Sequence, residues 1–163
     1  MLLARQAVEA KDWPTAFACA DTVVGSAAEL DIYIEATFLR AEALRGLGRY
    51  GEAITGYNEI LANRAAPRRL KPDALLGIAA CLCAQKEWNQ ANAYYQRVYV
   101  LYGAYKPQVA AAYLGSAACF EQTGERQKAI NTYDAFLESD ASRGTAEAAV
   151  ARQRRAALTG GQP

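Results

Sequence analysis

The amino-acid sequence predicts an all-α protein in which antiparallel helix pairs stack side by side as an α-solenoid. Three observations lead to this prediction. A motif recurs every 37 or 38 residues, proline and glycine stand where helices should begin and end, and no segment shows the sustained apolar–polar alternation of strands. With 163 residues, 52% of them hydrophobic, the chain is long enough for one domain or a short repeat array.

The recurring motif places small and large residues at fixed offsets. Four segments align without gaps, and an alanine closes each of them, at positions 16, 53, 91 and 129. Another alanine stands twelve residues before each closing alanine, and Tyr57, Tyr95 and Tyr133 follow the last three by four residues. Two helices approach closely only where side chains are small, and a large residue one turn later fills the adjacent space. The motif therefore predicts four helix pairs, in units of about 1–26, 27–66, 70–104 and 107–140.

Local signals place the individual helices. Pro14, Pro72 and Pro107 each stand where a helix should begin, because the first turn does not need the N–H that proline lacks. Ser26 and Glu29 have the spacing of a capping box, and glycines at positions 48 and 124 mark turns between paired helices. The expected helices span residues 2–10, 14–25, 30–46, 50–62, 72–85, 88–102, 107–123, 126–138 and 145–158.

The last expected helix, 145–158, has a thin apolar stripe and a basic outer face. This combination is typical of a capping helix, which covers the final repeat and keeps the array in solution. Residues 159–163 are predicted to form a disordered tail.

The charge balance argues against several classes of partner. Eighteen Lys and Arg residues against seventeen Asp and Glu residues leave a net charge of +1, so no overall field attracts nucleic acid, a membrane or an acidic substrate. Two local basic clusters lack interleaved aromatic residues and are interpreted as solvated surface: Arg64, Arg68, Arg69 and Lys71, and Arg152, Arg154 and Arg155. We therefore predict no nucleic-acid binding.

No apolar run reaches the about 20 residues that a membrane span needs, so we also predict no membrane insertion. The start of the chain lacks the features of a secretory signal. A soluble, cytoplasmic protein is the default expectation, and a periplasmic location follows only if the chain was cut from a longer secreted protein. The compartment stays open at this point.

The sequence offers little for catalysis. It has no histidine, no glycine-rich phosphate loop and no G-x-S-x-G motif. Glu35 and Glu42 could act as a carboxylate pair, but they need only be polar residues of a binding groove. The four cysteines form no C-x-x-C pair, and their apolar neighbours favour buried free thiols with a raised pKa over disulfides. We predict no enzymatic activity, no metal site and no cofactor.

The stretch from Gly48 to Tyr57 combines a turn glycine, an aromatic residue, a closing alanine and a tyrosine. It resembles the tetratricopeptide-repeat (TPR) family, and the stretch from Gly124 to Tyr133 is similar to it. The resemblance covers about residues 1–139. It implies a right-handed, TPR-like superhelix of about four repeats plus the capping helix, in a single repeat domain over residues 1–158, that binds another protein.

The sequence departs from the family pattern in two ways. The units step by 37 and 38 residues rather than 34, so we expect helices lengthened by about a turn or longer loops. Such units are common in bacterial relatives that act in cell-envelope assembly. The aromatic residue usual early in the first helix is replaced by Thr37 and Leu75 and kept only as Tyr113. The first unit also lacks its opening turn, which suggests that the chain was cut from a longer protein.

In this family the first helix of every unit lines the concave face, where peptides bind. The resemblance places these candidate groove residues there: Glu35, Phe38, Glu42, Arg45, Asp73, Leu76, Ala80, Cys83, Ala111, Leu114, Ala118, Glu121 and Gln122. The lysines and asparagines with which some relatives grip a carboxyl terminus are missing at these positions, so that ligand is rejected. An apolar segment or helix of a partner could instead contact Leu76, Ala80, Leu114 and Ala118, with Glu35, Glu42 and Arg45 setting its register.

Two alternatives stay open for these residues and for the function. The leucines could be packed by neighbouring units or by a missing part of a longer protein. The chain could then be a structural or self-associating segment of a larger assembly instead of an adaptor. Six of the ten tyrosines lie within residues 94–113; we expect Tyr95, Tyr99 and Tyr102 in the core, and Tyr94 and Tyr105 in exposed contacts.

Overall fold

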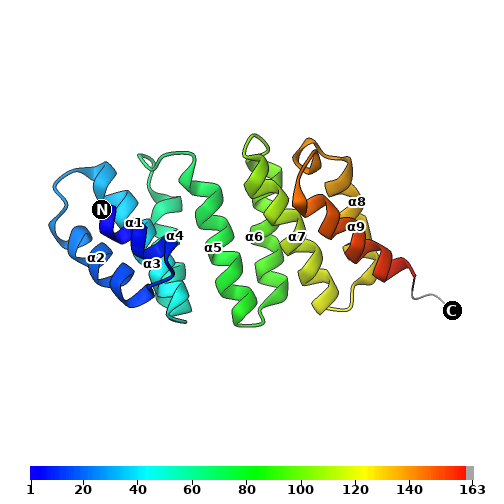
Figure 1. The fold of residues 1–163 in the computed structure, drawn as a ribbon, viewed down its shortest axis with the longest axis horizontal. Helices are drawn as coiled ribbons and strands as arrows, with labels where there is room; N and C mark the ends of the chain where they lie inside the picture. The colour runs from blue at the N-terminus through cyan, green and yellow to red at the C-terminus, as the bar shows by residue number, and fades with distance from the viewer. Residues whose placement is uncertain (161–163) are drawn as a thin grey trace. The chain divides into compact units, whose positions relative to one another are not determined.

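A computed structural model describes residues 1–160, and within this range all regular secondary structure is helical, with no strands (Figure 1). The helices of the described residues are α1 (Leu2–Glu9), α2 (Trp13–Ser26), α3 (Leu30–Gly46), α4 (Tyr50–Ala62), α5 (Leu70–Ala84), α6 (Trp88–Leu101), α7 (Lys106–Gln122), α8 (Arg126–Glu138) and α9 (Ala146–Thr159), with the 3₁₀ turn η1 (Asp140–Ser142) before the last. All nine predicted α-helices are present, and their ends lie within two residues of the predicted ones.

The chain divides into two compact units, Met1–Cys81 and a second that begins at Leu82. In the first unit α1 packs against α2 and α3, and α3 packs against α2 and α4. In the second unit α7 packs against α6, α8 and α9, and α8 packs against α9. Within each unit these helices pack on their neighbours in sequence, and α1 with α3 and α7 with α9 also touch across the helix between them. This packing confirms the predicted helical-repeat fold of paired helices; its right-handed twist stays a prediction.

The repeated alanines lie where helices touch. All eight are completely buried: Ala4, Ala16, Ala41, Ala53, Ala79, Ala91, Ala117 and Ala129. Gly56 marks the tightest of these approaches between α3 and α4, because a Cβ atom added there would lie 3.1 Å from the Cβ of Ala41. The large residues of the motif fill the adjacent space, and Tyr57, Tyr133 and Phe136 are completely buried. The predicted alternation of small and large residues therefore builds the core.

One residue in each turn between paired helices has a left-handed backbone. Its φ angle is 56° at Lys11, 76° at Gly48, 64° at Lys86 and 75° at Gly124. Glycine adopts this conformation freely, whereas a residue with a Cβ atom meets steric strain. The turn geometry is therefore the same in all four units, although only two of them supply glycine.

Side-chain caps differ from the predicted pattern at one helix. Asp12 caps α2, accepting a hydrogen bond from the Thr15 amide at 3.3 Å. The capping box expected at Ser26 and Glu29 is wrong. Ser26 is the last residue of α2, and its hydroxyl donates to the carbonyl of Thr22 one turn earlier at 2.9 Å, so it is not available to cap α3.

The capping helix α9 packs on α7 and α8 within the second unit. Ala148 and Ala151 join the buried cluster that contains Tyr133 and Phe136, and Arg155 forms an ion pair with Asp134 of α8. Thr145 caps the helix, its hydroxyl accepting from the Ala148 amide at 3.3 Å. Of the predicted tail 159–163, Thr159 belongs to α9, and residues 161–163 lie outside the described part of the chain.

Candidate partner-binding surface

Four positions of each first helix lie on one face. In α3 they are Glu35, Phe38, Glu42 and Arg45, and steps of three, four and three residues bring side chains to one side of a helix. The same positions recur 38 residues later on α5 and again on α7. We call this set the first-helix face: Glu35, Phe38, Glu42, Arg45, Asp73, Leu76, Ala80, Cys83, Ala111, Leu114, Ala118 and Glu121, with Gln122 beside it. Every one of these side chains keeps part of its surface exposed, so each can be reached from solvent.

In the first unit a buried tyrosine organises this face. The hydroxyl of Tyr57, on α4, donates to Glu42 at 2.5 Å and accepts from Nε of Arg45 at 3.3 Å. Arg45 also donates to Glu42 at 2.6 Å. The Tyr57 ring packs on Gly77 of α5, where an added Cβ atom would lie 2.4 Å from the ring. Tyr57 therefore reaches from the second helix α4 to both first helices, α3 and α5.

The electrostatics of this network fix the protonation states of Tyr57 and Arg45. Burial, reinforced by the Glu42 carboxylate, raises the pKa of the Tyr57 hydroxyl far above neutrality. Burial acts to lower the pKa of Arg45, but the nearby Glu42 carboxylate outweighs it and raises that pKa. The hydroxyl therefore stays a donor, and the guanidinium stays charged beside a carboxylate, over the physiological range.

The second unit contains related arrangements. The hydroxyl of Tyr133 donates to Glu121 at 2.5 Å, and Arg154 of α9 forms an ion pair with Glu121 at 3.0 Å. Burial and the Glu121 carboxylate raise the pKa of Tyr133. The Tyr95 ring packs on Gly115 as Tyr57 packs on Gly77, and the Tyr95 hydroxyl lies 3.7 Å from Sγ of Cys83.

These contacts follow one rule. Arg45, Cys83 and Glu121 occupy the same position of successive first helices, and each contacts the hydroxyl of the tyrosine twelve residues further on. The prediction identified both sets of residues but did not connect them. The constant spacing of twelve was the signal in the sequence that could have revealed the contact.

The cysteines differ in burial and in thiol pKa more than predicted. Cys81 and Cys119 are buried, as expected, whereas Cys19 and Cys83 are only half-buried. Burial raises the pKa of Cys81 to about 11. The pKa of Cys83 is lowered to about 7, because hydrogen bonds from Cys119 and Tyr95 stabilise its thiolate more than desolvation opposes it. The expectation that apolar surroundings raise every thiol pKa is therefore wrong for Cys83.

Three acidic residues of the first-helix face each form an ion pair with an arginine, which offsets their negative charge. Glu35 pairs with Arg5 at 2.5 Å, Glu42 with Arg45, and Glu121 with Arg154. Beside these pairs, Phe38, Leu76 and Leu114 share one position of the repeat and are half-buried apolar side chains. Leu114 also packs against the core cluster of the second unit. It therefore contributes both to folding and to the surface.

The tyrosines between residues 94 and 113 do not divide into a buried set and an exposed set as predicted. Tyr94, Tyr95, Tyr99, Tyr102 and Tyr105 are all half-buried. Tyr99 joins the core through a stack on Tyr113 with ring centroids 4.1 Å apart, and Tyr94 lies beneath the Arg97 guanidinium. Exposure alone therefore does not single out Tyr94 and Tyr105 as contact residues.

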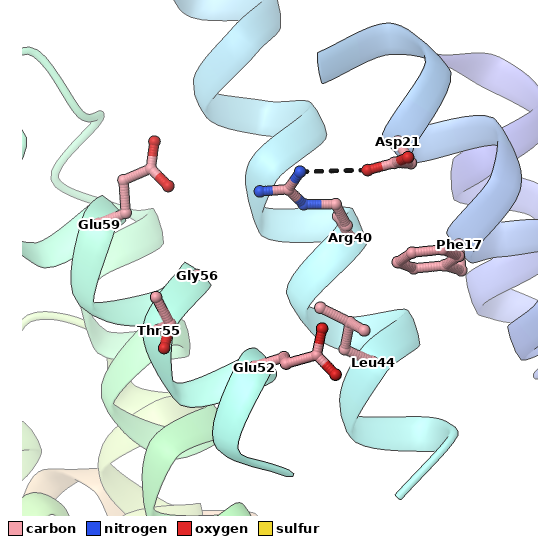
Figure 2. A pocket seen from close by; sticks show the side chains of 8 residues that line it. All are labelled: Phe17, Asp21, Arg40, Leu44, Glu52, Thr55, Gly56 and Glu59. Carbon is pink, nitrogen blue, oxygen red and sulfur yellow. Dashed lines mark hydrogen bonds and ion pairs between the residues drawn. The ribbon is translucent and has the colours of Figure 1, made fainter. Parts of the chain in front are cut away.

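A hollow that the sequence did not predict lies between α2, α3 and α4, with a volume of about 280 Å³ (Figure 2). Its acidic side chains already have partners. Asp21 binds Arg40 at 3.2 Å, Glu52 binds Arg49 at 2.6 Å, and Glu59 accepts from the Tyr33 hydroxyl at 2.5 Å. Arginines therefore offset two of the three carboxylates, and Glu59 is held by a neutral hydroxyl.

Comparisons with known proteins and the character of the helices indicate which family the chain resembles. A family model described as tetratricopeptide repeat matches residues 70–142. None of the curated proteins compared with the chain matches it. Within residues 1–160, no helix combines the length and the apolar character that crossing a membrane requires. The family match over residues 70–142, together with the nine helices of the described residues and the alanines and tyrosine that continue the motif upstream of it, supports a tetratricopeptide-repeat protein.

Proposed function

We propose that this chain is an adaptor that binds an apolar segment or helix of a partner protein on its first-helix face. Tetratricopeptide repeats are generally protein–protein interaction modules, and scaffolds of this family are typically not enzymes. The proposal names the surface and the chemistry of the partner. Both go beyond what the family determines.

The observation that carries the proposal is the recurrence of a half-buried apolar side chain at one repeat position, as Phe38, Leu76 and Leu114. An apolar side chain that recurs at one position of successive repeats suits the apolar stripe of an amphipathic segment. Large apolar residues also supply most of the binding energy where they become fully desolvated.

The charged residues beside these apolar side chains favour a partner whose contacting surface is uncharged. Glu42 and Arg45 neutralise each other, and both are tied to Tyr57. A partner that covers this network does not leave an isolated buried charge, which would be costly. The remaining acceptor and donor capacity of the pair can orient polar groups at the edge of the contact.

Site-specific photocrosslinking tests the surface directly. Benzoylphenylalanine is introduced for Leu76 in one variant, for Leu114 in a second, and for Val100 in a control. Val100 lies on the second helix α6 and is 70% exposed, so the control probe is at least as accessible. After irradiation in lysate of the source organism, one protein should be captured at positions 76 and 114 and not at 100. Capture of the same protein at all three positions, or only at 100, would contradict the proposal.

Substitutions then test whether the contact carries binding energy. Leu76→Asp and Leu114→Asp should each weaken capture of the crosslinked partner at least tenfold, whereas Val100→Asp should leave it unchanged. Because Leu114 also packs on the core, circular dichroism must show unaltered helix content in each variant. A folded Leu76→Asp variant with full affinity would refute the assignment of this face.

A second function, self-association within a larger assembly, is favoured by one feature of the first unit. Met1, Leu2, Leu3, Cys19 and Val23 line a mainly apolar hollow of about 530 Å³ between α1 and α2. Leu2 is 69% exposed and Leu3 68% exposed. If this surface mediates self-association, the mass measured by light scattering should rise with concentration, and Leu3→Asp should abolish the rise. A constant monomer mass would exclude this function.

A further inference from the structure

Two thiols of the second unit are in contact. Sγ of Cys83, near the end of α5, lies 3.8 Å from Sγ of Cys119 on α7, and the Tyr95 hydroxyl lies 3.7 Å from Cys83. The cysteines are 36 residues apart in sequence. Cys83 is half-buried, whereas Cys119 is only 2% exposed. One residue of the pair is therefore partly exposed to solvent, and its neighbour is shielded.

We propose that Cys83 and Cys119 form a peroxide-sensitive site, in which oxidation converts the two thiols into a reversible disulfide between α5 and α7. Cys83 is the residue that meets the oxidant, and Cys119 is the resolving thiol. The site goes beyond partner binding. Only its effect on partner capture rests on the proposed function, since Cys83 belongs to the first-helix face.

The chemistry balances with hydrogen peroxide as the oxidant. The Cys83 thiolate attacks one peroxide oxygen, the O–O bond breaks, and the products are a sulfenic acid on Cys83 and hydroxide. The sulfur of Cys119 then attacks the sulfenic sulfur, an S–S bond forms, the S–O bond breaks, and the hydroxyl leaves with the Cys119 proton as water. Two thiols are oxidised and one peroxide is reduced. A dithiol reductant reverses the step by thiol–disulfide exchange.

The electrostatics favour Cys83 as the attacking thiol. The lowered pKa of Cys83 gives it a larger thiolate fraction at neutral pH than an ordinary thiol has. The same contact raises the pKa of Cys119, which therefore keeps its proton while Cys83 is charged. Once Cys83 becomes a neutral sulfenic acid, that charge is gone and Cys119 can react.

The position of the pair allows the sulfurs to close. A disulfide needs an S–S distance of about 2.05 Å, so the two atoms must approach by about 1.7 Å. Cys83 is the penultimate residue of α5, and Cys119 lies in the last turn of α7. Helix ends open more easily than helix centres, so side-chain rotation and a small shift of these ends can share the movement.

Neither other cysteine offers this combination. Cys81 is completely buried, and burial raises its pKa to about 11. Cys19 is half-buried like Cys83 but belongs to the first unit. Cys19 is therefore a matched control for accessibility without the neighbouring thiol of the second unit.

Peptide mapping of the full-length chain tests the inference without a partner protein. The protein is treated with a small excess of hydrogen peroxide at pH 7, its remaining thiols are alkylated, and it is digested with trypsin. Cys83 lies in the tryptic segment 70–86 and Cys119 in 98–126. We expect these two segments to be joined, with fragmentation placing the bond at Cys83, and two of the four thiols to be lost. Dithiothreitol should restore both.

Two variants isolate the pair. Cys119→Ala should abolish the joined segments, and Cys19→Ser should leave their yield unchanged, with circular dichroism confirming that both variants fold. Four alkylated thiols after treatment, a bond to Cys81 or between two chains, or Cys83 stopping at the sulfinic acid with Cys119 still free would each overturn the inference. These outcomes do not depend on crosslinking at positions 76 and 114, so failure of this site and failure of the adaptor function are distinguishable.

Discussion

Substituting Gly77 by alanine tests the packing that links α4 to the next first helix. A Cβ atom at this position would lie 2.4 Å from Cζ of Tyr57 and 2.7 Å from Cε1 and Cε2. Carbon atoms pack best at about 3.5–4.0 Å, so the ring or helix α5 must move by more than about 1 Å. Tyr57 has little freedom to move, because it is completely buried and its hydroxyl is held by Glu42 and Arg45.

The expected change in the free energy of unfolding combines two destabilising effects with one stabilising effect. Overpacking of a filled core costs about 1–3 kcal/mol, and displacement of the hydroxyl weakens a hydrogen bond to a charged group, which is worth about 1.5–3 kcal/mol. Alanine recovers about 1 kcal/mol through its higher helix propensity. We expect Gly77→Ala to lower the free energy of unfolding by about 2 kcal/mol. For a chain of this length, the midpoint of thermal unfolding should fall by about 4–8 °C.

Thermal and urea unfolding followed by circular dichroism measure this effect against two comparison variants. Gly115→Ala brings a Cβ atom equally close to Tyr95, but Tyr95 is only half-buried and its ring can turn toward solvent, so a smaller loss is expected. Gly51→Ala has no atom within 4 Å and should be neutral or stabilising. If Gly77→Ala proved as stable as Gly51→Ala, the Tyr57 ring would not hold the position that this reasoning requires.

Three further predictions concern the tyrosine network, the turns and the thiol. Tyr57→Phe removes the hydroxyl that donates to Glu42 and should reduce the free energy of unfolding by about 1.5–3 kcal/mol in urea titrations; an unchanged value would mean that the bond contributes nothing. Lys86→Gly relieves a left-handed backbone and should raise the unfolding midpoint slightly, whereas Gly124→Lys should lower stability by about 1 kcal/mol; equal effects of both would argue against the strain. The rate of Cys83 alkylation should rise with pH through a midpoint of about 7, because only the thiolate reacts, and a midpoint at the ordinary thiol value would contradict the lowered pKa.

The helical fold was predictable because its signals are local or repeat at a constant interval. Proline in first turns, glycine in two of the turns, and alanines at fixed spacing report on a residue's own backbone and on how closely two adjacent helices can approach. Ser26 shows where local reasoning fails. Its spacing to Glu29 fits a capping box, yet the preceding helix extends through Ser26 and binds its hydroxyl to the Thr22 carbonyl. A capping box before α3 and a continuation of α2 both fit the sequence at Ser26. The sequence alone does not show which of the two is more stable.

The sequence by itself therefore determined the helix pairs, the buried alanines and which side chains share the face of each first helix. Only the tertiary structure decided what those side chains contact. Cys83 looked like an ordinary apolar thiol among alanines and leucines, and its lowered pKa arises from Cys119, 36 residues away, and from the Tyr95 hydroxyl. The physical reason is that a pKa or a hydrogen bond depends on atoms within a few ångströms in space. Helix periodicity places a side chain on a face, but the packing of one helix against the next determines which atom it meets there.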